Sequence, residues 1–435
     1  MTPKKLIYSL FLISGISGLI YEVVWTRMLT LLFGSTVFAV SAVTTAFFAG
    51  LALGSYYLGK YADTHPNPLK TYAYLEAAIG LTGFLLPVLL GLLTPIAIFI
   101  YRHYSTTFYL LNLIQFVLIF GVLCIPTTLM GGTLPVLAEH FGRESAPLGR
   151  EVGRLYALNT LGAVGGTLAT GFFLIETIGV RHTNYLAVFL NLFVAATAWG
   201  LARRSDPRKP AERSAVLQKP GERNAASLHK KAFLLAFGLS GFAALAYEIL
   251  CLRILIFVLP YGYNSIYVFS TVLIVFLTGI ALGSALISRV IDRLENLMIW
   301  FCGIEIALGL YIAFTLTLLV RGVAHWSLFP NSLHGERFVD GFLKTGLMLL
   351  FPTVLMGILF PLAGKIYSQR FEPSASPSPP SSKLGSEIGR VYSANTLGGI
   401  LGSFFAGFVG VPFLGIQKSL GATSLFSLSA ALIVY

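Results

Sequence analysis

Charged residues are scarce in this sequence. Asp, Glu, Lys and Arg make up only 11% of its 435 residues, whereas soluble domains carry about 25%. So little charge, spread over the whole length, leaves too little polar surface for a water-soluble globule. Apolar runs long enough to span a bilayer, roughly 20 residues each, recur instead. Because a backbone in lipid must satisfy its own hydrogen bonds, these continuous runs predict an all-α polytopic membrane protein.

The sequence also lacks the patterns of a metal or disulfide protein. Its three cysteines fall in apolar segments without CxxC spacing, and its seven histidines are scattered. We therefore expect no disulfide framework, no metal site and no cofactor. The net charge of +12 lies in connecting loops. Such a distribution is typical of membrane topology, so the lipid bilayer is the expected partner and nucleic acid is not.

The apolar runs predict about twelve spans in two sets of six. The first set lies near residues 6–30, 36–59, 71–99, 107–129, 153–177 and 183–202. The second set lies near residues 231–259, 264–288, 297–320, 341–366, 386–411 and 416–435. The chain therefore divides into a first six-helix repeat at 1–202, a basic cytoplasmic linker at 203–230 and a second six-helix repeat at 231–435. A shorter Pro/Ser tract at 373–382 interrupts the second set.

The distribution of Lys and Arg sets the predicted orientation. With the N-terminus in the cytoplasm, the inside segments hold 22 of the 30 Lys and Arg and the outside loops hold six. The other two, Arg27 and Arg253, lie inside spans. Because short loops rich in positive charge stay in the cytoplasm, we expect a cell (inner) membrane protein with both termini on that side.

The two sets repeat the same motifs. Ser14-Gly15-x5-Tyr21-Glu22-x4-Arg27 recurs 226 residues later as Ser240-Gly241-x5-Tyr247-Glu248-x4-Arg253. The segment from Gly149 to Gly166 matches the segment from Gly385 to Gly402 at 10 of 18 positions. Six spans per copy is an even number, so both copies enter the membrane from the same side. This predicts a parallel, two-fold repeat of major-facilitator type.

Four Gly-x3-Gly pairs lie inside the predicted helices, beginning at Gly50, Gly162, Gly279 and Gly398. Small residues four apart let two helix backbones approach closely, which packing in lipid requires. We interpret them as structural.

Two acids end the second and eighth spans, Asp63 and Asp292. An acid there can accept hydrogen bonds from the free amides at the start of a neighbouring helix. The pattern resembles the loop motif after the second span of major facilitator transporters, where such an acid helps to close the cytoplasmic side. An ordinary solvated loop acid is the alternative.

Ionisable residues inside spans one and seven are the most informative ones. An ionisable residue at that depth is costly unless paired and is by default a functional hypothesis. Five residues apart on one helix, Glu and Arg point about 140° apart, so each is expected to meet a partner on another span. They either lock helices and extend to the interface, or form a cation or proton site on Glu22 and Glu248. The candidates for substrate binding or ion coupling are Tyr21, Glu22, Arg27, Tyr247, Glu248 and Arg253.

A second polar set lies nearer the cytoplasmic side. Glu76 and Glu305 lie about two turns into spans three and nine, and Arg154 and Arg390 begin spans five and eleven at a similar depth. A Glu–Arg bridge is predicted in each half, beside a hydrogen-bonding face formed by Tyr156, Asn159, Tyr392 and Asn395. The set is either a gate that breaks when the halves rock or a static clamp.

These motifs, with Leu129-Met-Gly-Gly-Thr-Leu-Pro135 and Tyr156-x2-Asn159-Thr-Leu-Gly-Ala163, resemble the membrane region of bacterial fused MFS/spermidine synthase-like proteins. The resemblance covers essentially the whole chain. It implies an aminopropyltransferase-like domain after the membrane part, but the glycine-rich loop and acidic residues of such a domain are not found. We therefore identify no catalytic residues in this chain, and the resemblance alone does not indicate an enzyme.

These observations leave three possible functions. The first is a transporter of a small solute by alternating access, and the resemblance suggests a cationic, polyamine-like solute. The second is a membrane anchor for a separate soluble transferase, without transport of its own. The third is a scaffold that does not transport. Few polar residues line the predicted midplane, which counts against a large polar solute and favours the anchor.

Overall fold

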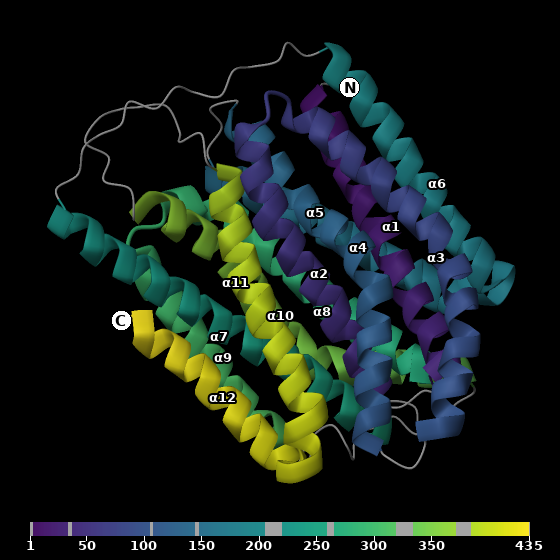
Figure 1. Cartoon of the computed structure of the whole chain (residues 1–435). Coiled ribbons are helices and arrows are strands. Elements are labelled where there is room, and N and C mark those ends of the chain that lie inside the picture. The colour runs from purple at the N-terminus through teal and green to yellow at the C-terminus, as the bar shows by residue number, and fades with distance from the viewer. Residues whose placement is uncertain are drawn as a thin grey trace.

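The computed structural model describes residues 3–33, 37–104, 108–143, 148–204, 220–258, 265–318, 334–370 and 384–434. Twelve α-helices occupy these ranges (Figure 1). The first six are α1 (Pro3–Phe33), α2 (Val37–Thr64), α3 (Pro68–Tyr104), α4 (Phe108–Gly142), α5 (Leu148–Ala169) and α6 (Ile175–Arg204). The second six are α7 (Pro220–Val258), α8 (Ser265–Val290), α9 (Leu297–Leu318), α10 (His334–Arg370), α11 (Leu384–Phe404) and α12 (Gly415–Val434).

Two glycines let the chain reverse direction between helices without a loop. A π-helical segment, η1 (Thr170–Leu174), joins α5 to α6, and a second, η4 (Phe405–Leu414), joins α11 to α12. Figure 1 shows α11 and α12 as the two arms of a hairpin. Each reversal uses a positive φ, 77° at Gly179 and 75° at Gly415, which only glycine adopts readily. The turn is therefore built into both repeats.

The described residues contain ten stretches that are long and apolar enough to cross a membrane. Two of them, Arg150–Arg204 and Leu384–Val434, are 55 and 51 residues long and each contains one such reversal. The all-α, polytopic fold of about twelve spans is thus confirmed.

The segment that links α6 to α7 in the structure is shorter than the predicted linker at 203–230. Helix α6 continues to Arg204 and α7 already begins at Pro220, so both ends of the predicted linker are helical, which corrects its bounds. Residues 205–219 and the Pro/Ser tract lie outside the described residues.

The Gly-x3-Gly pairs pack helices together within each half. A side chain on Gly54 would meet the backbone of Thr128 in α4, and one on Gly283 would meet Val354 in α10. Likewise, Gly398 contacts the backbone of Gly238 in α7. Close backbone approach of this kind requires small residues, which supports the structural interpretation.

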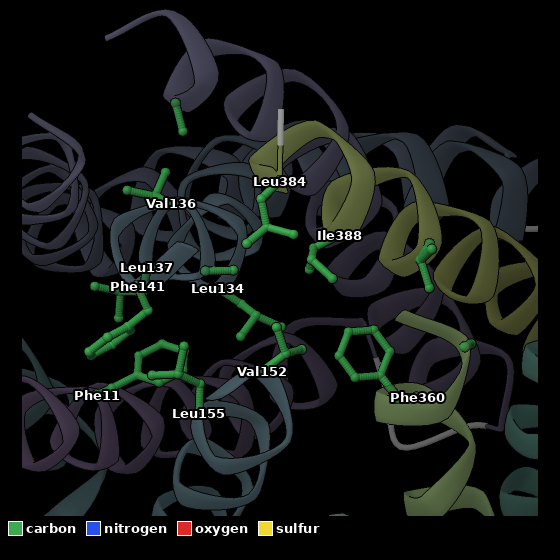
Figure 2. Close-up of a cluster of buried hydrophobic side chains, with 14 of the residues drawn as sticks. Phe11, Leu134, Val136, Leu137, Phe141, Val152, Leu155, Phe360, Leu384 and Ile388 are labelled. Atoms are coloured by element: carbon green, nitrogen blue, oxygen red, sulfur yellow. The ribbon is translucent and has the colours of Figure 1, made fainter. Parts of the chain in front are cut away.

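The apolar core shows where the two halves join. We call the end of the bundle where α1 begins the N-terminal face, and the other end the opposite face. Near the N-terminal face, one cluster of buried side chains contains residues of both halves, among them Phe11 and Leu134 of the first half and Phe360 and Leu384 of the second. Figure 2 shows Leu384 and Leu134 in this cluster, with the Leu134 side chain directed toward Val152.

Toward the opposite face the core divides into two separate clusters. One contains only second-half residues, such as Leu250 and Met348. The other contains only first-half residues, such as Trp25 and Phe47. The halves are therefore fused by apolar packing at the N-terminal face and have separate cores beyond it.

Candidate functional site

A cavity of about 230 Å³ lies between the two halves. Residues of all six helices of the first half line it, with Ile79 from α3 and Asn191 from α6, and residues of α7, α8, α10 and α11 line it from the second half. The cavity is thus built from both repeats, as a solute site between rocking halves requires.

Each half contributes a polar stripe from its first helix. On α1 the stripe is Ser14, Gly18 and Glu22, and its copy on α7 is Ser240, Ala244 and Glu248. Residues four apart share one helix face. The small side chain one turn before each glutamate leaves open space in front of the carboxylate, and a side chain on Gly18 would meet no atom within 4 Å.

The two carboxylates are the only charged groups lining the cavity within the described part of the chain. Glu22 is 8% exposed, and the carboxylates of Glu22 and Glu248 interact electrostatically with each other. No ion pair joins either of them to a described residue. The sequence predicted a partner on another span for each of them, or a cation or proton site on the two glutamates; the structure brings the two acids to one cavity.

The tyrosines beside these glutamates point elsewhere. Tyr21 stacks on Trp25, with ring centroids 4.7 Å apart, and packs against Gly83 of α3. The hydroxyl of Tyr247 bonds Thr315 at 2.9 Å and the carbonyl oxygen of Met348 at 3.1 Å. One residue step turns a helix by about 100°, so both tyrosines lie inside their own half rather than in the cavity.

Arg27 and Arg253 do not line the cavity either. Both are half-buried, and the Nε of Arg253 has no hydrogen-bond partner among the described residues. The structure therefore brings Glu22 and Glu248 together and leaves the other four members of that predicted set outside the site.

The predicted Tyr/Asn face does line the cavity, from α5 and α11. Tyr156 and Tyr392 are among the lining residues, as are Asn159 and Asn395. Each asparagine also donates to the first helix of its own half: Nδ2 of Asn159 to Phe11 O at 3.1 Å, and Nδ2 of Asn395 to the equivalent carbonyl at 3.2 Å. These hydrogen bonds fix α1 against α5 and α7 against α11.

The predicted Glu–Arg bridges are wrong. Glu76 accepts hydrogen bonds from Ser14 Oγ at 2.5 Å and Asn191 Nδ2 at 2.6 Å. Glu305 accepts from Ser427 Oγ at 2.7 Å. Both glutamates are fully buried and bond to neutral side chains of their own half, because they face the first and sixth helices of that half and not the fifth.

The two arginines of that prediction lie on the surface. Arg154 approaches Glu151, one turn away, at 3.8 Å, and half of its side chain is exposed. Arg390 is exposed and pairs with no acid that the structure describes. Glu151 instead binds α1, through Lys4 at 2.9 Å and through the hydroxyl of Tyr8.

Asp63 fastens the two halves at the N-terminal face. Its carboxylate, at the end of α2, accepts the backbone N–H of Ser386 at 3.1 and 3.3 Å. Ser386 lies in the first turn of α11, whose free amides favour an acid. Glu139 at the end of α4 accepts the neighbouring N–H of Gly385 at 3.1 Å. The predicted helix-start contact is therefore present, and it crosses between the halves.

The equivalent contact in the other half uses ion pairs instead. Asp292 follows α8 in a short 3₁₀ turn, η2 (Ile291–Arg293). It lies 3.5 Å from Arg150 of α5 and 3.5 Å from Lys365 of α10. Lys365 also donates to the carbonyl oxygen of Ile291 at 2.6 Å. Asp63 and Asp292 thus occupy equivalent positions and both bind the other half.

Several other residues take part in these contacts at the N-terminal face, which we call the N-terminal closure. They were not predicted from the sequence. Ser55 of α2 and Ser393 of α11 bond each other at 2.8 Å between Oγ atoms. Arg143 bonds Glu139 at 2.8 Å and the carbonyl oxygen of Ala62 at 3.1 Å. One signal was available: Glu139 and Lys365 stand 226 residues apart, at repeat-equivalent positions, with opposite charges.

Removing the Asp63 carboxylate should loosen the N-terminal face. Substituting Asp63→Ala loses a helix cap, which costs about 1–2 kcal/mol, or a roughly 5- to 30-fold shift in a two-state ratio. A cysteine at position 393, buried at 5% exposure, in a background without native cysteines, should then react faster with a thiol reagent. Asp63→Asn keeps an accepting oxygen and should show a smaller increase. Equal rates in all three proteins would contradict the proposed closure.

The halves also touch near the opposite face. Tyr267 of α8 donates a hydrogen bond to Glu176 at the start of α6. Phe172 of η1 stacks on Tyr267 at 5.8 Å and approaches Phe342 of α10 at 5.8 Å between ring centroids. Among the described residues, these contacts are mostly aromatic, and no ion pair joins the halves at this face.

Comparisons with known proteins agree with this architecture. No family model and no curated protein matches the chain. Among solved structures, a bacterial homologue of the iron transporter ferroportin, in an outward-facing state, superposes with a TM-score of 0.61 at 14% identity, covering 100% of this chain and 98% of that chain.

Two further structures share the fold. The human organic anion transporter MFSD10 has a TM-score of 0.61 at 12% identity and 100% coverage of both chains. The fucose:proton symporter FucP of E. coli has a TM-score of 0.56 at 12% identity, covering 100% of this chain and 98% of that chain. At these identities the likeness concerns the fold alone. The chain is a multi-pass membrane protein with a major-facilitator-like fold of two six-helix halves.

Proposed function

We propose that this protein is a secondary transporter that moves a small organic cation by alternating access. The observation that carries the proposal is the pair of carboxylates, Glu22 and Glu248, in a cavity that no Lys, Arg or His of the described residues lines. A cation would supply the positive partner that these buried acids lack.

The rest of the lining fits a solute with apolar parts. Aromatic rings of Phe47, Phe276 and Phe360, and the phenols of Tyr156 and Tyr392, surround the acids. Aromatic faces attract ammonium groups and also cover hydrocarbon. An amine with a hydrocarbon body matches both features. A polyamine, suggested by the resemblance to fused synthase-like proteins, is one member of that class, and a transferase partner stays a prediction.

The arrangement of the halves supports the mechanism. Hydrogen bonds and ion pairs of Asp63 and Asp292 join the halves at the N-terminal face, and no ion pair of the described residues joins them at the opposite face. If the N-terminal face is cytoplasmic, as the Lys and Arg distribution predicts, the described state is closed toward the cytoplasm. Breaking that closure and packing the opposite face together would expose the cavity to the other side.

Uptake into proteoliposomes tests this proposal. Purified protein is reconstituted and offered labelled spermidine, a labelled monoamine with a hydrocarbon chain, a labelled carboxylate of similar size and a labelled sugar. We expect time-dependent uptake of at least one amine, competed by other amines, and no uptake of the carboxylate. Uptake of the carboxylate or the sugar instead would overturn the cation assignment. No uptake of any solute would overturn transport and favour the membrane-anchor interpretation.

A further inference from the structure

The cavity has a second acidic layer behind its lining. Glu76 of α3 is fully buried and does not itself line the cavity, yet two side chains that donate hydrogen bonds to it do: Ser14 of α1 and Asn191 of α6. A path of one hydrogen bond therefore connects the carboxyl group to the cavity from two directions.

No charge compensates this carboxyl group. No Lys, Arg or His among the described residues forms an ion pair with Glu76. The titratable groups that interact with it are two phenols, Tyr21 of α1 and Tyr72 of its own helix. An unpaired buried carboxylate is costly, so this position needs either a transient proton or an unusually complete set of hydrogen bonds.

The hydrogen bonds suit both forms of the acid. In the described arrangement Ser14 Oγ donates to one carboxyl oxygen and Asn191 Nδ2 donates to the other, which matches a carboxylate. The Oδ1 of Asn191 is buried and has no hydrogen-bond partner among the described residues. A half-turn of that amide would present an acceptor to a protonated Glu76, and the serine hydroxyl can reverse its role by rotation. No other atom has to move.

The second half has only part of this arrangement. Ser240, the copy of Ser14, interacts with Glu305 and lines the cavity. Ser427 occupies the position equivalent to Asn191 and bonds Glu305 at 2.7 Å, but Ser427 does not line the cavity. The other carboxyl oxygen of Glu305, Oε1, is buried without a hydrogen-bond partner in the described part of the chain. Only the first half therefore offers two reversible partners that both reach the cavity.

We propose that Glu76 is the proton-binding site that couples a proton gradient to solute movement, exchanging its proton with the cavity through Ser14 and Asn191. The proton comes from water in the cavity, converts the carboxylate to a carboxylic acid, and leaves by the same route when the cavity faces the other side. This inference rests on the proposed transport function, and assigns coupling to a group distinct from the solute-binding pair.

A transport assay in two modes separates coupling from solute binding. We expect Glu76→Gln to retain exchange of labelled for unlabelled amine across the membrane, because exchange needs no net proton movement. It should lose the extra accumulation that a pH gradient drives in the wild type, falling to the level seen without a gradient. Glu305→Gln, the repeat-equivalent control, should keep gradient-driven accumulation. A wild type that exchanges amine but ignores the gradient, or a Glu76→Gln variant that still responds to it, would overturn the proposal.

A second readout does not depend on transport. Infrared difference spectra between acidic and alkaline pH on the purified protein should contain a carboxyl band that Glu76→Gln removes, Asn191→Ala shifts and Glu305→Gln leaves unchanged. Size-exclusion profiles and thermal unfolding check that each variant is folded, and Glu76→Asp should restore part of the band if glutamine does not fold. If no solute is transported but the Glu76 band is present, the proposed function fails while the proton site stands. If the band is unchanged by Glu76→Gln, the proton site fails whatever is transported.

Discussion

Replacing Glu22 and Glu248 together with glutamine is expected to abolish binding and uptake of the cationic solute. Truncating one partner of a buried charge pair costs about 2–5 kcal/mol, and about 2 kcal/mol already corresponds to roughly a thirtyfold weaker Kd. Both carboxylates line one cavity and act on one another, so each single variant should lose much of the affinity and the double variant nearly all of it.

Binding of the labelled amine to detergent-purified protein measures this effect directly. Glutamine keeps the size and the hydrogen-bonding ability of the side chain. A loss of affinity for the amine would therefore be caused by the missing charge and not by a cavity left by a smaller side chain. Glu295→Gln is the matched control, since Glu295 is an exposed acid away from the cavity and its loss should leave Kd unchanged. A double variant that binds as tightly as the wild type would remove the basis for the cation assignment.

Cross-linking Ser55 to Ser393 as a cysteine pair should stop transport completely. The two hydroxyl oxygens are 2.8 Å apart, on α2 and α11, and a disulfide needs its Cβ atoms about 3.5–4.5 Å apart. A bond here joins α2 to α11 on the same two helices that Asp63 connects, so the two halves can no longer separate at the N-terminal face. Solute should still bind from the opposite face, which distinguishes a locked protein from a damaged one.

The cross-link experiment requires a background in which Cys124, Cys251 and Cys302 are replaced, because all three are free thiols. Oxidation should abolish uptake and reduction should restore it in the same sample. The two single-cysteine proteins, treated identically, should transport in both conditions. Full uptake by the oxidised double variant would mean that α2 and α11 need not separate.

The two-fold repeat was predictable from the sequence, and so were several of the functional residues that it places at equivalent positions. Glu22 and Glu248 could be recognised because an acid is rare inside a span and because each has a copy at the same depth. Asp63 could be placed against a helix start because an acid at the end of α2 faces free amides at the same membrane depth. Periodicity and duplication carry this information without any knowledge of contacts.

The partners of Glu76 could not be predicted in this way. Depth alone put Glu76 level with Arg154, but pairing also depends on which neighbours the helix faces, and a nearly uniform apolar helix gives no strong periodic signal for that. The third helix packs between α4 and α6, and its acid faces α1 and α6, from which Ser14 and Asn191 donate hydrogen bonds to it.

The position of the reversal at Gly179 was predictable, but its form was not. The sequence predicts a break between 177 and 183, and the chain turns there at a single glycine with φ of 77°, with helix on both sides. Glycine is common in membrane helices as a packing residue, so its presence alone does not reveal a turn without a loop.

Labelling of one cysteine in the cavity from each side of the membrane tests alternating access most directly. A cysteine at Leu19, a cavity-lining position next to Glu22, is exposed in sealed vesicles to an impermeant thiol reagent added first outside and then inside. We predict reaction from both sides in transporting protein, and from the opposite face only when positions 55 and 393 are cross-linked. Reaction from one side alone in the free, transporting protein would contradict the account.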